Sequence, residues 1–438
     1  MSRLVARSVS LMDTTIPITF QFPLQDNEHE DIFERIAFWD SNSTREWFLQ
    51  RGYILYTHRH PDDHPWYSEP TLKCKDSCEM EYPYSHYESE GNTKTPLPAR
   101  LVCNQGTVAY GQETRNSSHH VAIKLIMTDS EEHRILQFLQ SQGMKVLKDN
   151  CLVPVLDILS NGPFSFVVMP RQVHILYLSC LWPNNDTRWS ACIDLPEGGP
   201  IKNVIRIVHS LLKDIKLENV LVSHFADDTD DYVSNSVRKQ LQWSDQLSYC
   251  LFDFDISMML PEDTDRARCR LPYRLSWHGS GWQPNDTLQG EFDYNPFAYD
   301  VGTLGRVLCL TYPHLIPRIP MFAPFLDKMV TRNVALRFSA EEALAFFEKI
   351  LPEIPEEVMN IECPEYQGVT DYETDRWEGL APEFIKKWEN YREPPIPFAT
   401  TVLRRLCSFD RMRYIVSAIR LFFFRISLVP VQIGLFPQ

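Results

Sequence analysis

One short stretch, residues 214–219, combines three side chains that could act together on a phosphoryl group. It contains Asp214, Lys216 and Asn219, and the apolar run 220–222 that follows it predicts a strand. An aspartate can accept the proton of an attacking hydroxyl, a lysine two residues on can neutralise a transferring phosphoryl group, and an asparagine can ligate a metal ion. Charged loops before strands are common, so other parts of the chain must supply the rest of such a site.

A second acidic position, Asp253, follows the apolar pair Leu251-Phe252. It precedes Phe254, and an aspartate before a phenylalanine is the pattern in which protein kinases bind Mg²⁺. Kinases usually have glycine as the third residue of that pattern, whereas this chain has Asp255. We therefore expect Asp253 and Asn219 to bind magnesium.

The upstream residues 121–124, Val-Ala-Ile-Lys, match the strand that carries the phosphate-binding lysine of kinases. Side chains two positions apart in a strand share a face, so Ala122 and Lys124 are expected to point the same way. A small residue would then lie over the base of ATP and a cation over its phosphates. Glu132 follows eight residues after Lys124 in a helical setting, and we expect it to pair with that lysine.

Two further positions are expected to border the bound nucleotide. Met169 ends a predicted strand and begins the hinge between two lobes. Gly106 lies in a turn between the predicted strands 101–103 and 107–110, where a kinase has a glycine-rich loop whose backbone N–H groups cover the phosphates. Only Gly111 accompanies it, so an ordinary hairpin glycine is an equal alternative.

Three charged residues later in the chain are expected to stabilise a second lobe. Asp300 begins an apolar helix and resembles the buried aspartate that anchors the catalytic loop of kinases. A buried carboxylate needs hydrogen-bond partners, and we expect these to be backbone N–H groups near Lys213 and Asp214. Arg337 resembles the late arginine that pairs with a glutamate below the activation segment, and Glu291 is its expected partner.

Other stretches make the resemblance more specific. The chain resembles the protein-kinase-like proteins that are abundant in mushroom-forming fungi. The resemblance is carried by residues 15–17, 37–40, 45–53, 252–255, 290–294 and 376–379, and it covers nearly the whole chain. It implies an α+β, two-lobed protein-kinase-like fold, with a small mostly-β N-lobe, a mostly-α C-lobe and extensions at both ends. It implies little about the substrate.

The pattern of the chain predicts four segments. These are a family-specific extension at 1–100, the N-lobe at 101–170, the C-lobe at 171–350, and a C-terminal extension at 351–438. Residues 172–187 and 224–248 are expected to be insertions within the C-lobe. The first matches no expected element, and a translated intron is the hypothesis that competes with an ordinary surface insertion.

The segment before Asp214 is shorter than in a kinase. A predicted helix at 201–212 runs directly into Lys213, so the turn and the His-Arg pair that normally precede the aspartate are missing. A catalytic base displaced by about 1 Å can lose about a hundredfold in rate. We therefore expect the chain to bind nucleotide better than it transfers phosphate.

Composition excludes some classes of partner. The chain has 438 residues with a net charge of −15, which argues against nucleic acid because phosphate binding needs a basic surface.

The eleven cysteines form no disulfide or zinc framework, so they are expected to be reduced thiols of a cytoplasmic protein. Cys74 and Cys78 lack further zinc ligands, and His58, His60 and His64 fit a solvated loop better than a metal site. We expect neither a signal peptide nor a spanning helix.

The C-terminal tail has a different character from the rest of the chain. Between residues 404 and 425 six arginines alternate with large apolar residues. A basic amphipathic helix can lie on an anionic membrane, although a packed or disordered tail is the favoured expectation.

Three functions fit these patterns. The preferred one is phosphoryl transfer from ATP with Mg²⁺ to Ser or Thr of a protein substrate, in which Lys216 steadies the transferred group. The alternative is a pseudokinase, a nucleotide-binding scaffold with weak or no catalysis, which the poor glycine loop and Asp255 favour and the retained metal and phosphate groups oppose. Small-molecule phosphotransferases of the antibiotic-kinase kind usually lack a lysine two residues after the base, so Lys216 favours a protein substrate.

Overall fold

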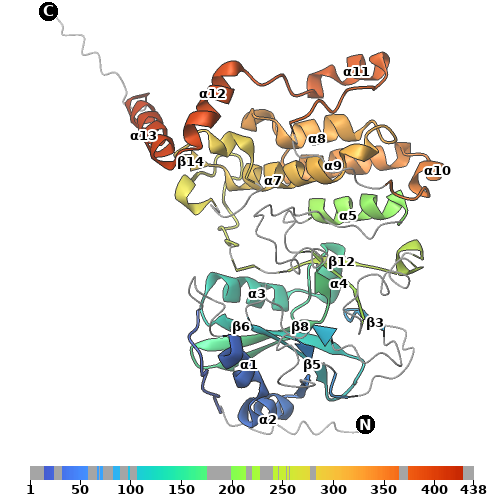
Figure 1. Ribbon diagram of the computed structural model, residues 1–438, viewed down its shortest axis with the longest axis vertical. Helices are drawn as coiled ribbons and strands as arrows, with labels where there is room; N and C mark the ends of the chain where they lie inside the picture. Colours follow the sequence, from blue (N-terminus) through green and yellow to red (C-terminus); the bar gives the residue numbers. More distant parts are fainter. Residues whose placement is uncertain are drawn as a thin grey trace, which may run out of the picture. The chain divides into compact units, whose positions relative to one another are not determined.

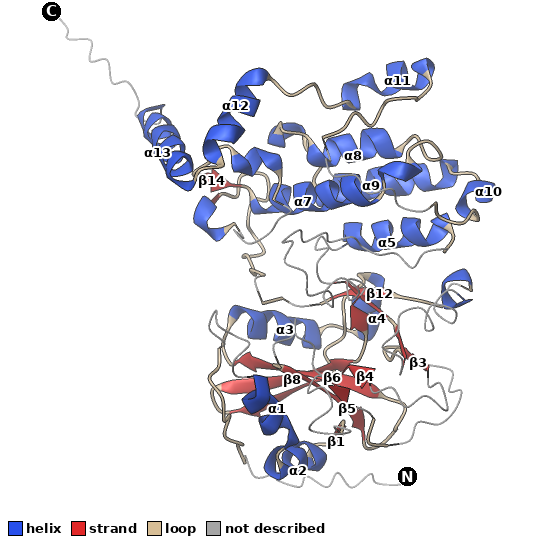
Figure 2. Cartoon of the chain, viewed as in Figure 1, coloured by secondary structure: helices blue, strands red, loops and turns tan. Residues whose placement is uncertain are grey.

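The computed structural model describes residues 14–23, 32–57, 67–68, 70–72, 82–88, 97–98, 106–174, 199–213, 220–226, 240–244, 246–252, 254–255, 257–276, 283–364 and 373–427. These residues form a mixed structure of antiparallel sheet and helices, which agrees with the expected α+β class (Figure 1). The chain divides into two compact units, Met1–Pro183 with Asn219–Met259, and Asn184–Glu218 with Leu260–Gln438. The first unit holds the strands of the main sheet, and the second holds most of the helices (Figure 2).

The first unit is built on a five-stranded sheet in the order β1-β5-β6-β8-β7, with every neighbouring pair antiparallel. The strands are β1 (Tyr53–Leu55), β5 (Val108–Glu113), β6 (His120–Met127), β8 (Phe164–Pro170) and β7 (Asp157–Asn161). Strands β6 and β8 are rich in β-branched and aromatic residues, which fit a pleated surface that is buried on both faces.

One face of this sheet is covered by α1 (Ile32–Asp40) and α2 (Asn42–Gln50). Their tryptophans and phenylalanines pack in a single core with alternate residues of β6 and β8: Phe38, Trp39, Trp47, Phe48, Val121, Ile123, Leu125, Phe166 and Val168. The expected boundary at residue 100 therefore does not separate two cores, because β1 and both helices precede it. The segment before residue 100 thus supplies one strand of the main sheet and one of its two covering layers.

The opposite face carries α3 (Glu131–Ser141) and α4 (Met144–Asp149). Ser130 caps α3 by accepting a hydrogen bond from the backbone N–H of His133 at 3.1 Å. Leu136 and Leu139 of α3 share a buried cluster with Val167 of β8. The helix is therefore held against the same face of the sheet to which the even-numbered residues of β6 point.

A smaller antiparallel sheet in the same unit joins β9 (Val173–His174), β10 (Val220–Val222) and β12 (Tyr249–Leu251), with β10 in the middle. Two further pairs are β11 (His224–Ala226) with β3 (His86–Glu88), and β2 (Tyr67–Ser68) with β4 (Leu97–Pro98). Strand β9 lies at the start of the expected insertion at 172–187 and pairs with β10. The expected insertion at 224–248 contains β11 and a helical turn at 240–243, and β12 begins directly after it at Tyr249.

The second unit contains the helices α5 (Ile201–Lys213), α7 (Pro296–Thr311), α8 (Phe322–Val330), α9 (Ala340–Ile350), α10 (Glu356–Met359), α11 (Pro382–Trp388), α12 (Phe398–Cys407) and α13 (Asp410–Ser427). A short strand pair, β13 (Leu271–Pro272) with β14 (Asp293–Tyr294), precedes α7. The unit also has 3₁₀ turns, among them η3 (Asn285–Leu288) and η5 (Val334–Leu336). None of the helices in the described ranges is long and apolar enough to cross a membrane.

A buried carboxylate attaches the segment after α10 to α8. Asp327 is 2% exposed and accepts hydrogen bonds from Arg376 and from the indole N–H of Trp377, each at 2.7 Å. The backbone N–H of Glu393 donates to the same carboxylate at 2.8 Å. Three donor groups on one carboxylate allow its charge to be buried at low cost, and they attach the late segment to the helical core.

Candidate functional site

The alternation of side chains along β6 decides which face of the main sheet carries Lys124, and we call this face the lysine face. Val121, Ile123 and Leu125 are at most 1% exposed in the aromatic core, so Ala122 and Lys124 lie on the opposite face. The register pairs Ala122 with Met169 of β8 and with Tyr110 of β5. The expected small residue, the lysine and Met169 therefore do share one face of the sheet.

Lys124 forms an ion pair with Glu132 on α3. The Nζ–Oε1 distance is 2.6 Å, and the two side chains are 18% and 12% exposed. The capped first turn of α3 and the packing of its apolar face fix the height of Glu132 above the strand. The pairing that the sequence predicts is present, whereas the nucleotide-binding role of both residues stays a prediction.

The neighbouring carboxylate on α3 holds the segment beyond β12. Glu131 Oε1 accepts a hydrogen bond from the backbone N–H of Met259 at 2.8 Å, and its Oε2 lies 2.6 Å from Arg134 Nη1. Phe252 and Phe254 are partly buried against the cluster that includes the apolar side of α3. The chain on either side of position 253 is therefore attached to the helix that carries Glu132.

The strands that flank the predicted metal ligands are antiparallel neighbours. The register pairs Val220 with Leu251, so the start of β10 lies beside the end of β12. Asp214, Lys216, Asn219 and Asp253 lie outside the described residues. Within the described ranges, no group of three or more His, Cys, Asp or Glu side chains is arranged to hold a metal ion.

A cluster of buried polar side chains borders Ala122 on the lysine face, and the sequence interpretation missed it. Arg171 donates to the hydroxyl of Tyr56 at 2.9 Å, and that hydroxyl lies 2.5 Å from Nδ1 of His120. The guanidinium of Arg171 also lies 4.2 Å from the ring centroid of Tyr110. The alternation that orients Lys124 also orients His120, so this histidine was within reach of the sequence pattern.

Burial sets the protonation of this cluster. The pKa of His120 is lowered to about 3, first by desolvation and then by the charge of Arg171. A neutral His120 accepts the hydrogen bond from Tyr56 at Nδ1, while Tyr56 accepts from Arg171. The three groups therefore form a directed chain of donors next to the predicted base-binding position.

Gly106 has a structural contact that the sequence did not predict. Its carbonyl oxygen accepts a hydrogen bond from the indole N–H of Trp39 at 2.9 Å, in buried surroundings. The turn that was expected to lie over a phosphate is thus attached to α1. No contact in the described residues tests its role toward a nucleotide.

In the second unit, Arg337 does not pair with Glu291, so that prediction is wrong. The Arg337 side chain is 1% exposed and forms its ion pair with Asp286 of η3. It also donates to the carbonyl oxygens of Ala298 at 2.9 Å and Thr331 at 2.8 Å. Glu291 lies five residues further along and pairs with Arg420 of α13 at 2.8 Å.

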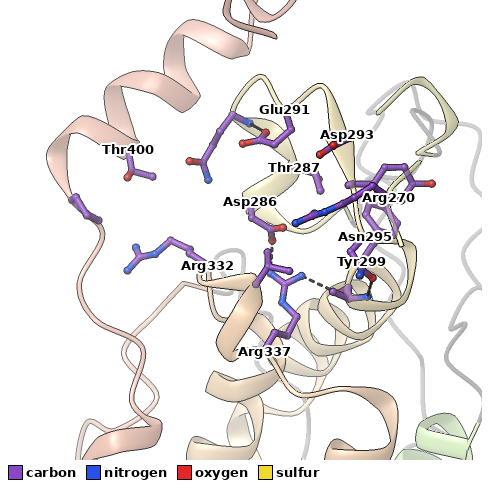
Figure 3. Close-up of a pocket in the computed structure, with 15 residues that line it drawn as sticks. Arg270, Asp286, Thr287, Glu291, Asp293, Asn295, Tyr299, Arg332, Arg337 and Thr400 are labelled. Carbon is purple, nitrogen blue, oxygen red and sulfur yellow. Dashed lines mark hydrogen bonds and ion pairs between the residues drawn. The ribbon is translucent and has the colours of Figure 1, made fainter. Parts of the chain in front are cut away.

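Gly302 of α7 lets the Arg337 side chain approach the helix closely. A Cβ on Gly302 of α7 would lie 2.6 Å from Nη1 of Arg337 and 2.9 Å from Pro284, so a larger residue would displace both. Arg337 and Asp286 also line a pocket of about 280 Å³ together with Glu291 (Figure 3). The side chains that line it are both acidic and basic. Arg337 and Asp286 pair with each other, whereas Glu291 pairs with Arg420 outside the lining.

Asp300 is exposed, which contradicts the prediction that it is buried. It lies near the beginning of α7, whose buried run starts only at Val301. A carboxylate near the start of a helix is favoured by the helix dipole and needs no burial. Its charge contributes, after burial, to raising the pKa of Tyr294 to about 12.

Comparison with protein-family models and with curated proteins found no match.

Proposed function

We propose that this chain is a protein-kinase-like protein that binds ATP with Mg²⁺ and transfers a phosphoryl group to Ser or Thr of a protein substrate. The ion pair of Lys124 with Glu132 carries the proposal, because a half-buried lysine held at a fixed height over a sheet is suited to binding phosphates. Ala122 beside it leaves room for a planar base.

The metal-binding part of the proposal is supported by strand connectivity. Asn219 is covalently joined to the first residue of β10, and Asp253 follows the last residue of β12 by two positions. Since these strand ends are neighbours, an amide and a carboxylate would be available at one place. Oxygen ligands of this kind suit Mg²⁺ in company with phosphate oxygens.

The roles proposed for the remaining residues follow the resemblance to fungal protein-kinase-like proteins. Asp214 would accept the proton of the substrate hydroxyl, and Lys216 would balance charge on the transferred group. Mg-ATP, when bound, would supply the phosphoryl group. Met169 and Gly106 would border the nucleotide.

The second candidate is a pseudokinase, a nucleotide-binding scaffold with weak or no transfer. Helix α5 continues to Lys213, so no residue separates it from Asp214. That observation favours binding over catalysis, because the base has no preceding turn to set its position.

Thermal unfolding with and without Mg-ATP tests nucleotide binding. A ligand that binds only the folded state at a hundred times its Kd stabilises it by about 2.7 kcal/mol, so the melting temperature should rise. Lys124→Ala and Asp253→Ala should each remove most of the rise, measured against each variant without nucleotide. Lys145→Ala is the matched control, since its side chain is 86% exposed in a surface ion pair and its loss should leave the rise intact.

Two results would count against the proposal. The first is the lack of any shift in the intact protein at millimolar Mg-ATP. The second is a shift that Lys124→Ala and Lys145→Ala preserve equally. Phosphate transfer to a generic protein substrate, measured beside Asp214→Asn, separates the kinase from the pseudokinase.

A further inference from the structure

Helix α13 has two faces of different chemistry. Its outward face repeats large apolar residues at helical spacing: Ile415, Ile419, Phe422, Phe423 and Ile426, which are 50–63% exposed. Phe398 at the start of α12 and Phe409 between α12 and α13 are also exposed, at 83% and 66%. We call these exposed residues of the two helices, with the arginines among them, the C-terminal helical surface.

The inward face of α13 is docked on the second unit. Arg420 pairs with Glu291, and the ring of Phe424 lies 5.2 Å from that of Phe292. Gly290 has a φ of 76°, and a Cβ there would lie 2.6 Å from Val416, so glycine permits the close approach. The helix is therefore packed, as the favoured expectation had it, yet packing covers only one of its faces.

The six arginines of the two helices fall into two groups by their ion-pair partners. Arg404, Arg413 and Arg420 each have a carboxylate partner, which is Glu373, Asp410 or Glu291. Arg405, Arg411 and Arg425 are exposed, and none has an ion-pair partner among the residues that the structure describes. Asp410 is the only acidic residue in the sequence from 398 to 438, so this segment cannot neutralise them itself.

We propose that the C-terminal helical surface binds the surface of anionic phospholipid membranes, with α13 lying in the plane of the interface. Arg411 in the first turn and Arg425 in the last turn bracket the apolar residues, so both could reach headgroups while the phenylalanines enter the acyl boundary. The whole chain has a net charge of −15, so the attraction to anionic lipid is confined to the arginines of the C-terminal helical surface.

Other occupants fit less well. A symmetric second copy would bring the same arginines of two α13 helices together without acidic partners, which opposes association. The outward side of a single helix is convex, so it offers no groove for an extended peptide. An acidic protein partner would match the positive charge of the arginines. Its charged surface would leave the exposed phenylalanines between Arg411 and Arg425 without an apolar environment.

Vesicle flotation of the full chain tests the proposal. The protein should float with vesicles of phosphatidylcholine containing phosphatidylserine, and it should stay behind with vesicles of phosphatidylcholine alone. Phe422→Ser combined with Phe423→Ser should weaken binding by at least about tenfold through lost apolar burial. Arg411→Gln combined with Arg425→Gln should weaken it about thirtyfold and reduce its salt dependence.

Matched controls exclude a general surface effect. Phe33→Ser removes a phenylalanine that is 66% exposed on α1, and Arg318→Gln removes an exposed arginine after α7; neither should alter flotation. Circular dichroism should show that the double variants keep their fold, since the changed side chains are exposed. Equal flotation with both vesicle types, loss of binding in the controls, or a concentration-dependent dimer that the phenylalanine variant abolishes would overturn the proposal.

Discussion

Arg337 and Glu291 show how a charged residue can be recognised from sequence while its partner is not. Arg337 is buried as expected for a structural arginine, but Asp286 is nearer to it in the fold. Glu291 instead faces α13, and burial raises its pKa despite the charge of Arg420. Asp286, the partner found in the structure, lies five positions before Glu291, the partner that was expected.

Replacing Asp286 should therefore destabilise the protein more than replacing Glu291. Asp286→Asn leaves a buried guanidinium without its countercharge and should lower the free energy of unfolding by about 3 kcal/mol. Glu291→Gln affects a pair whose arginine is 38% exposed, and it should cost within about 1 kcal/mol. Urea unfolding measures both, and equal losses would contradict the assignment of Asp286.

The burial of His120 predicts that the free energy of unfolding depends on pH. Its pKa is about 3 in the folded protein against 6.5 in the unfolded chain, so the unfolded state binds a proton first as the pH falls. Stability is therefore present above pH 6.5 and is lost as the pH falls from 6.5 toward 3. Between pH 7 and pH 5 this residue alone should remove about 2 kcal/mol.

His120→Gln checks that prediction, because glutamine can accept the hydrogen bond from Tyr56 but does not titrate. Urea unfolding at both pH values should show a smaller loss in the variant by about that amount. His119, which is exposed in part and pairs with Glu113 at 3.1 Å, provides the control His119→Gln. An unchanged slope in His120→Gln would show that His120 is not buried in neutral form.

At the scale of elements, the N-terminal helices are part of the sheet's core. Trp39 is fully buried and joins α1 to the turn at Gly106. Trp47 and Phe48 of α2 pack against Phe166 of β8, which is also fully buried. A sheet without this layer would expose one entire apolar face.

Trp39→Ala should accordingly lower the free energy of unfolding by about 4 kcal/mol through the cavity and the lost hydrogen bond. Phe33→Ala, on the same helix but 66% exposed, is the control and should change it by less than about 0.5 kcal/mol. Chemical denaturation compares the two. Similar losses in both variants would mean that α1 does not pack as described.

At the scale of the whole molecule, the junction between α5 and Asp214 decides how active the protein can be under the proposed function. The helix keeps its apolar side buried to Leu212 and ends at Lys213. A chain that passes from a buried helix to a catalytic loop without a turn has little freedom to place its base. The protein should therefore bind Mg-ATP yet transfer phosphate slowly.

Inserting about a dozen residues with a His-Arg pair before Asp214 should raise the transfer rate sharply, because a misplaced base can cost about a hundredfold. An insertion of equal length without that pair is the control for added flexibility. Single-turnover phosphate transfer is the measurement. A rate of about 1 s⁻¹ or faster in the unaltered chain would refute this account of the junction.

The sequence by itself determined the features that depend on local periodicity. Alternation along residues 121–124 placed Ala122 and Lys124 on one face, helical spacing placed Glu132 on α3, and the apolar pattern after residue 201 predicted α5 almost to its last residue. Each of these follows from neighbours within about ten residues, where the backbone period fixes the side-chain direction.

Tertiary structure alone decided which distant groups meet. In the folded chain Asp300 is exposed, and Arg337 forms its ion pair with Asp286. Strand β1 pairs with β5 of the main sheet, and Arg171 donates to Tyr56 across 115 positions of the chain. Such partners are chosen by the packing of whole elements, because an ion pair or a hydrogen bond forms only where the backbone brings both ends within about 3 Å.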